Sequence, residues 1–194
     1  METYASSTAE LVTEMIQYMV DKPTLRHIEA VSLLAGICVD TKNFCFKTGV
    51  RTFEAAAFLR RHGADTMDVK KMFSDDLKVF LKKADIIRSA EIKNEIAIAI
   101  CPKEVQDTVI AAQAADELLN ITGIEASFVI VKIDDEIFIS GRSLGKINVQ
   151  LILETLGGGG HMTMASTKFT SMELGEVVDK LKEAIEKYLK EDEK

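Results

Sequence analysis

The sequence predicts an α/β protein in which a helical first part precedes a sheet covered by helices. Two observations support this fold class. In the second half of the chain, segments follow in the order strand, helix, hairpin, helix, strand, helix, which is typical of a sheet with helices packed against it. Hydrophobic residues make up 47% of the 194 residues, which is enough for a core in one ordinary domain or in two small ones.

Helix signals dominate the first part. Ser7 and Glu10 have the spacing of a capping box, which predicts a helix that runs to about residue 20 and ends before Pro23. A second helix is predicted over residues 24–35.

The next segment predicts a strand and a third helix. Residues 36–39 form a short apolar run that ends on an acid, Asp40, and we interpret this run as a strand. Residues 52–61 are rich in helix formers, with Thr52 as the predicted N-cap and Gly63 as the predicted C-cap.

Residues 67–89 have a charged, helical pattern without Gly or Pro. We interpret them as a helix that connects two domains, residues 1–66 and residues 90–194.

Strand and helix signals alternate after this helix. Residues 95–101 predict a strand, and residues 102–120 predict a helix with Pro102 near its first turn. Residues 127–133 and 137–140 are rich in β-formers and flank three acidic residues, which predicts a hairpin.

The chain closes with a helix, a short strand and a long helix. Residues 146–156 predict a helix that four glycines end, and a strand is expected near Lys168. The last helix carries apolar residues on one face and Lys and Glu on the other. The apolar residues are Leu174, Val177, Val178, Leu181, Ile185 and Leu189.

Charge and composition exclude some function classes. The net charge of -7 argues against a generic binder of DNA or RNA backbones, but it leaves room for a small anionic ligand held by local donors. Cys38, Cys45 and Cys101 lack zinc-ligand spacing, and we expect buried thiols in a reducing cytosol. No apolar run reaches the roughly 18 residues of a membrane span, so we expect a soluble chain without direct membrane contact.

The run from Gly157 to His161 is the strongest candidate site. Consecutive glycines expose backbone N–H groups, and such a nest suits phosphate oxygens, while a histidine adds a donor. The alternative is a flexible turn with an incidental histidine, but four glycines favour phosphate binding. The predicted contacts are Gly158, Gly159, Gly160 and His161.

Arg142 follows the predicted hairpin and is the second candidate. A guanidinium can bind a phosphate with two N–H groups, Ser143 offers a hydroxyl, and Asn148 offers an amide from the helix that follows. The alternative for Arg142 is a solvated surface group.

Asp40 is the candidate metal ligand, because carboxylates at strand ends commonly hold metals in α/β sites. The alternative is a helix cap or a turn former. His27 and His62 lie in helical contexts without acids at ligand spacing, so His27 is predicted on a helix surface and His62 at a helix C-terminus.

Taken together, the motifs resemble the DHH/DHH-associated phosphoesterases, and most closely the GdpP-type cyclic-di-AMP phosphodiesterases. The matching segments span almost the whole chain, and their combination is specific although each is weak. They are residues 4–14, 34–41, 48–57, 112–116, 140–143, 148–151 and 157–161.

This resemblance implies a mixed sheet in the DHH-associated domain and, before it, the C-terminal part of the DHH catalytic domain. It implies two manganese ions in the catalytic lobe, one ligand falling on Asp40, and phosphate contacts from Arg142, Ser143 and the glycine-histidine run. The family reaction is hydrolysis of cyclic di-AMP to pApA. The sequence has neither Asp-x-Asp nor Asp-His-His, so we expect the C-terminal portion of a longer enzyme, inactive alone.

Three hypotheses follow. The chain is part of a phosphodiesterase whose whole protein is anchored in the membrane with this part on the cytoplasmic face. Alternatively, it is a non-catalytic nucleotide- or RNA-binding module, or a RecJ-like oligoribonuclease relative acting on short oligonucleotides. Apolar surface exposed on the first domain also makes a homodimer an expected partner arrangement.

Overall fold

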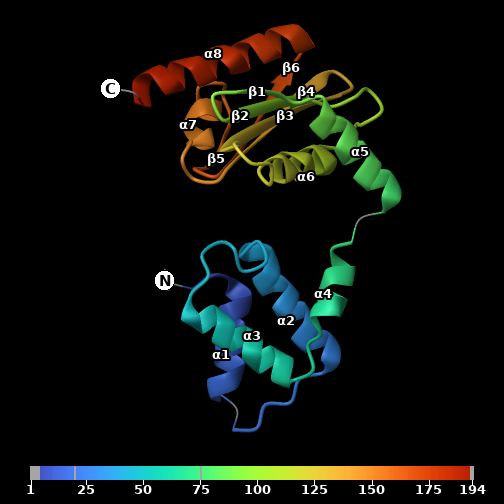
Figure 1. Cartoon of the computed structure of the whole chain (residues 1–194), viewed down its shortest axis with the longest axis vertical. Helices are drawn as coiled ribbons and strands as arrows, with labels where there is room; N and C mark the ends of the chain where they lie inside the picture. The colour runs from blue at the N-terminus through green and yellow to red at the C-terminus, as the bar shows by residue number, and fades with distance from the viewer. Residues whose placement is uncertain (1–4, 20, 75, 193–194) are drawn as a thin grey trace. The chain divides into compact units, whose positions relative to one another are not determined.

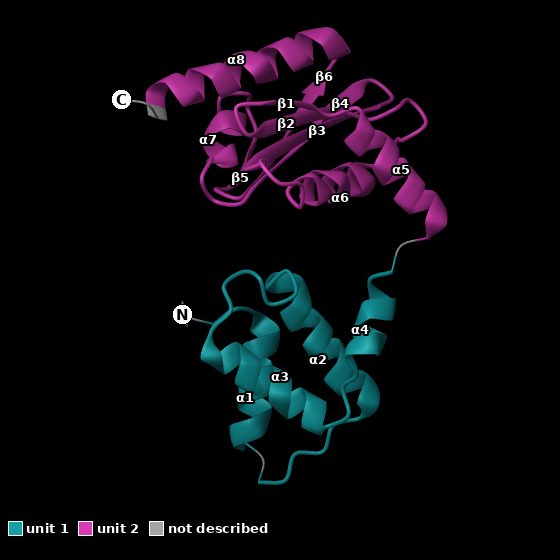
Figure 2. Cartoon of the chain, in the orientation of Figure 1, with its two compact units in different colours: residues 1–74 teal, residues 75–194 magenta. Residues whose placement is uncertain are grey.

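The computed structural model describes residues 5–19, 21–74 and 76–192 (Figure 1). The chain divides into two compact units, residues 1–74 and residues 75–194 (Figure 2). We describe each unit by itself. Among the described residues, no helix combines the length and the apolarity that a membrane span requires.

The regular secondary structure among the described residues of the first unit is helical. It contains α1 (Thr8–Met19), α2 (His27–Asp40), α3 (Val50–Arg61) and α4 (Thr66–Met72). Its core gathers aliphatic and aromatic side chains from α2 and α3, which include Leu34, Ile37, Phe58 and Leu59. α1 and α2 pack closely at Gly36, where an added Cβ would lie only 2.9 Å from the Cβ of Ala9.

The strand predicted over residues 36–39 is wrong, because α2 continues through this run to Asp40. An apolar run cannot be assigned to strand or helix by hydrophobicity alone. The helical period explains the burial here: Leu34, Ile37 and Cys38 are spaced i, i+3 and i+4 and are buried, whereas Val39 is 56% exposed.

The starts of α1 and α3 depend on short-range side-chain hydrogen bonds. The hydroxyl of Ser7 accepts from the N–H of Glu10 at 3.0 Å, which confirms the predicted cap, and the described helix ends at Met19, with residue 20 outside the described residues. The N-cap of α3 is Gly49 rather than the predicted Thr52. Thr52 instead accepts the N–H of Gly49 at 3.1 Å from the third helical position.

The predicted connecting helix over 67–89 is broken into α4 and α5 (Leu77–Arg88). Asp76 accounts for the break, because its carboxylate accepts the N–H of Lys78 at 2.7 Å and so begins a new helix. The division between the two units falls at this interruption.

The second unit is a six-stranded mixed sheet with helices on both faces, which confirms the predicted fold class. The strands are β1 (Glu91–Lys93), β2 (Ile96–Ile100), β3 (Ala126–Ile133), β4 (Glu136–Ser143), β5 (Gly159–His161) and β6 (Met164–Thr170). The order of the described strands across the sheet is β1-β2-β3-β4-β6-β5, in which β2 and β3 pair in parallel and the other neighbours pair antiparallel.

Each face of this sheet has its own core. Phe128 and Ile130 of β3 pack with Leu181 on the side of α7 (Val149–Glu154) and α8 (Leu174–Asp192). Val129 and Val131 point to the opposite side, where α5 and α6 (Thr108–Leu118) lie (Figure 1). The predicted apolar face of the last helix is confirmed, since Val177, Leu181 and Ile185 are buried.

Two helices of this unit begin later than predicted. α6 starts after Asp107, whose carboxylate accepts the N–H of Val109 at 2.7 Å, rather than near Pro102. α7 starts after Asn148 rather than at residue 146. The predicted hairpin of β3 and β4 is confirmed, although β4 runs on to Ser143, and β1 and β5 were not predicted as strands.

Only one of the three thiols is fully buried. Cys38 is buried and Cys101 is intermediate, but Cys45 is exposed, so the prediction of a buried Cys45 is wrong. Burial raises the pKa of the Cys101 thiol to about 12.

Candidate phosphate-binding groove

A groove of about 500 Å³ lies on the α6 face of the second unit, between α6 and the strands β4, β5 and β6. This volume is within the range of ordinary small-ligand pockets. The lining residues are Thr108, Ala112, Phe138, Ile139, Ser140, Arg142, Gly159, Gly160, His161, Met164, Ala165 and Ser166. We call it the groove.

The strand register places the two cationic candidates on one face. Arg142 of β4 pairs with Met164 of β6, and Met164 pairs with His161 of β5. Directly paired residues project from the same face of a sheet, so the three side chains form one row. With neighbouring strands about 4.8 Å apart, the Cα atoms of Arg142 and His161 are separated by roughly 10 Å.

Arg142 is held in place by neighbouring oxygens. Its Nε donates to a carboxylate oxygen of Asp116 on α6 at 3.2 Å, and one terminal nitrogen donates to the carbonyl of Gly141 at 3.0 Å. The side chain is only 12% exposed. A guanidinium has five N–H donors, so these two hydrogen bonds leave further N–H groups that can donate to an anion in the groove.

The glycine run forms an edge strand rather than a four-residue nest. Gly159, Gly160 and His161 pair with β6, while the N–H of Gly158 donates to the carbonyl of Leu153 at 2.9 Å. A Cβ at Gly158 would lie 2.4 Å from the carbonyl oxygen of Ser166. Gly158 therefore allows close packing, and it is not among the residues that line the groove.

Ser143 and Asn148 lie away from the row. Ser143 is 3% exposed, points to the opposite face of the sheet from Arg142, and accepts the N–H of Gly145 at 2.9 Å. Asn148 is the N-cap of α7, and its side-chain oxygen Oδ1 accepts the N–H of Gln150 at 3.1 Å. The groove thus brings together Arg142 with the three residues of β5.

Ser140 and Ser166 are lining residues that the sequence analysis did not select. Ser140 stands two residues before Arg142 on β4, so the period of two puts both on the α6 face. That signal was present in the sequence, but it required knowing that β4 continues past residue 140.

Asp40 lies in the first unit, exposed, as the last residue of α2. The reasoning that placed it at a strand end is therefore wrong. In the portion of the chain that the structure describes, no group of three or more His, Cys, Asp or Glu side chains could hold a metal ion. These residues do not fit the two-manganese centre that the resemblance implies.

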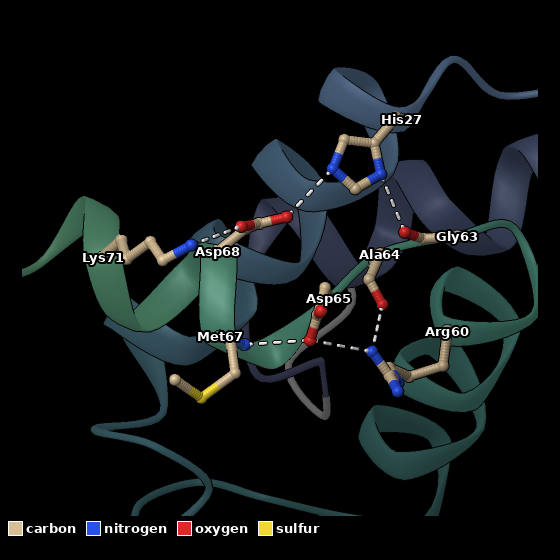
Figure 3. A network of polar contacts seen from close by, with 8 residues as sticks. All are labelled: His27, Arg60, Gly63, Ala64, Asp65, Met67, Asp68 and Lys71. Atoms are coloured by element: carbon tan, nitrogen blue, oxygen red, sulfur yellow. Dashed lines mark hydrogen bonds and ion pairs between the residues drawn. The ribbon is translucent and has the colours of Figure 1, made fainter.

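The other histidines join elements of the first unit. His27 does have an acidic partner, because its Nε2 lies 3.0 Å from Asp68 on α4, while its Nδ1 lies 2.9 Å from the carbonyl of Gly63 (Figure 3). Lys71 approaches the same carboxylate at 3.5 Å. His62 follows the last residue of α3, as predicted, and contacts the carbonyl of Pro23 at 3.1 Å.

The second unit matches a known protein family. The family model of the DHHA1 domain matches residues 93–191, which include every residue that lines the groove. The chain belongs to the DHHA1 domain family. The resemblance inferred from the sequence motifs is thereby confirmed, and the groove is a feature of the DHHA1 domain of this chain.

Curated relatives and a solved structure agree with this membership. The chain is 47% identical to the cyclic-di-AMP phosphodiesterase GdpP of Bacillus subtilis over 193 residues, and 47% identical to the cyclic-di-AMP phosphodiesterase PdeA of Listeria monocytogenes. These matches cover 97% and 98% of this chain but 29% of each relative.

The fold is shared with an exopolyphosphatase-related protein of Bacteroides fragilis. The TM-score is 0.85 at 22% identity, over 95% of this chain and 57% of that one. This likeness concerns the fold alone.

Proposed function

We propose that this chain is part of a phosphodiesterase that hydrolyses cyclic di-AMP to pApA, and that its groove holds phosphate groups of the substrate. The observation that carries the proposal is the row of Arg142 and His161 on one face of the DHHA1 domain. Relatives that share 47% of its residues are cyclic-di-AMP phosphodiesterases, which supports the choice of substrate.

The electrostatics of the row favour a small anion over a long nucleic acid. The chain as a whole is acidic, with a net charge of -7, so a polyanion would be repelled outside the groove. Asp116 balances part of the charge of Arg142, and His161 adds a donor across the row. A single phosphate between them would receive hydrogen bonds from both sides.

The residues of this chain would bind and orient the phosphodiester. Arg142 donates to non-bridging oxygens, and Asp116 keeps the guanidinium pointed along the row. In the family, a manganese centre would supply the activated water. The described residues do not fit that centre, so we assign it no step and expect no turnover above background from this chain alone with manganese.

The proposal extends to the setting of the whole protein. By the resemblance, the whole enzyme is anchored in the membrane, and this chain lies on the cytoplasmic side as a homodimer. Cyclic dinucleotides are the proposed ligands, with short oligonucleotides as the alternative.

Calorimetry with cyclic di-AMP, pApA and AMP tests the phosphate site. We expect R142A and H161A each to weaken binding of pApA about tenfold or more, the effect of losing one charge-assisted hydrogen bond. K103A, which removes an exposed cation of the same unit outside the groove, is the matched control. Unchanged affinity for pApA in the double variant R142A/H161A would refute the assignment of the phosphate site.

A further inference from the structure

A second cavity lies on the α8 side of the sheet, opposite to the face that carries the groove (Figure 1). It is bounded by β1, β2 and α8, and we call it the α8 cavity. Its volume is about 150 Å³. An apolar cavity of this size can hold a molecule as large as one aromatic ring.

The floor of the α8 cavity is aliphatic. Ile96 and Ile98 of β2 form it together with Ile185 and Leu189 of α8. Ile96 and Ile185 are buried, whereas Ile98 and Leu189 are only partly buried against the same core. Part of the apolar surface of Ile98 and Leu189 therefore remains open in the cavity, where an apolar group could cover it.

The rim of the α8 cavity is charged. Lys182 of α8 lies 3.0 Å from Glu91 of β1, and Lys93 of β1 lies 3.5 Å from Glu186 of α8. All four residues line the cavity, and their side chains are between 46% and 78% exposed. Ion pairs at such exposure contribute little to stability, so these groups can exchange partners at small cost.

The charges of the rim alternate in sign. Glu91 and Lys93 are two residues apart on β1, a distance of about 7 Å, and Lys182 and Glu186 are one helical turn apart on α8. A ligand with a single charge would be repelled by two of these four groups. A zwitterion can instead place each of its charges beside groups of opposite sign.

We propose that the α8 cavity binds a free α-amino acid with an aliphatic side chain about as large as that of leucine. The ammonium group lies against the two glutamates of the rim, and the carboxylate lies against the two lysines. The side chain covers Ile98 and Leu189. This site goes beyond the proposed hydrolysis of cyclic di-AMP and does not depend on the phosphate site, which lies on the other face of the sheet.

Calorimetry with four probes tests the ligand class. L-leucine carries both charges and the side chain, 4-methylpentanoate lacks the ammonium, 3-methylbutylamine lacks the carboxylate, and glycine lacks the side chain. We expect each of the last three to bind the wild-type chain about tenfold or more weakly than leucine. Each loses either a charge-assisted hydrogen bond or the burial of four carbon atoms.

Variants of the rim assign each charge of the ligand. K182A should weaken leucine and 4-methylpentanoate about threefold to tenfold without weakening 3-methylbutylamine, because the amine has no carboxylate. E186Q should weaken leucine and the amine without weakening 4-methylpentanoate. K180A is the matched control, because Lys180 is an exposed lysine of α8 that does not line the cavity. It should leave all four affinities unchanged.

A variant of the floor separates this site from the groove. I98F places a larger side chain in the α8 cavity and should abolish leucine binding while leaving the affinity for pApA unchanged. The rim variants alter exposed side chains only, so their urea midpoints should stay close to that of the wild type.

Three results would overturn the inference. If leucine bound the wild type no more tightly than both singly charged analogues, the zwitterion site would be removed. Unchanged leucine affinity in the double variant K182A/E186Q would place the amino acid elsewhere. Failure of leucine to bind the wild type would remove the site altogether. The phosphate site would survive each of these results, because R142A and H161A test it with pApA.

Discussion

Replacing Gly160 by alanine should detach the edge strand that carries His161. Gly160 has a φ of +151°, and a Cβ there would lie 2.4 Å from the carbonyl oxygen of Met164, where ordinary contacts are 3.4 Å or longer. Backbone strain of this kind costs about 1–3 kcal/mol, and forced overpacking costs about 1–3 kcal/mol more. We therefore expect G160A to destabilise the β5–β6 pairing by about 2–6 kcal/mol.

The neighbouring glycine provides the matched control. Gly159 has no positive φ, and no atom lies within 4 Å of the position its Cβ would take. We expect G159A to change the free energy of unfolding by less than about 1 kcal/mol, the cost of a tolerated surface substitution.

Hydrogen exchange and urea unfolding measure the difference. In G160A, the amides of β5 should exchange far faster than in the wild type, and AMP binding should fall because His161 leaves its row. G159A should keep wild-type exchange in β5. Equal exchange rates and equal urea midpoints for the two variants would refute the steric argument.

Three further predictions concern other parts of the chain. Arg51 holds the pKa of Glu14 below its usual range through a side-chain hydrogen bond, so E14Q should lose about 0.5–1 kcal/mol at pH 7. That contribution is present above the ordinary pKa of 4.5 and lost as pH falls through the lower folded value, so urea midpoints of wild type and E14Q should converge in acid. Iodoacetamide at pH 8 should label exposed Cys45 and spare Cys101, whose pKa of about 12 keeps it a thiol, as mass spectrometry of digests would report. N148A removes the N-cap of α7 and should lower the free energy of unfolding in urea by about 1 kcal/mol without changing the affinity for AMP. A lower affinity for AMP in N148A would instead show that Asn148 contacts the ligand.

The sequence was most informative where one period extends over many residues. The last helix repeats its apolar face over five turns, and the hairpin alternates on both sides of Asp134 and Asp135, so local spacing was sufficient for both. The residues at which helices start were harder to predict from the sequence. Pro102 is compatible with a first turn, but the cap that begins α6 is Asp107, and only the bond to Val109 identifies it.

The candidate site was predictable in its residue types but less so in its arrangement. Arg142 and His161 were selected from local motifs, yet their common row depends on Met164 and on pairing across β6. Asp40 was misplaced because an apolar run in a helix resembles one in a strand. The contact between His27 and Asp68 joins residues 41 positions apart, which no local pattern encodes.

The parallel pairing of β2 with β3 has a consequence for the order in which the groove forms. β3 and β4 are joined by a two-residue turn, and such hairpins close within about 1–10 μs. β2 reaches β3 only through the crossover that contains α6, and β6 reaches β4 after the long segment from Ser143 to Met164. Contacts between distant parts of a chain form late because loop closure opposes them. The wall of the groove on α6 and its floor on β6 are thus late-folding parts around an early hairpin, so refolding chains should regain hairpin structure before they regain affinity for AMP.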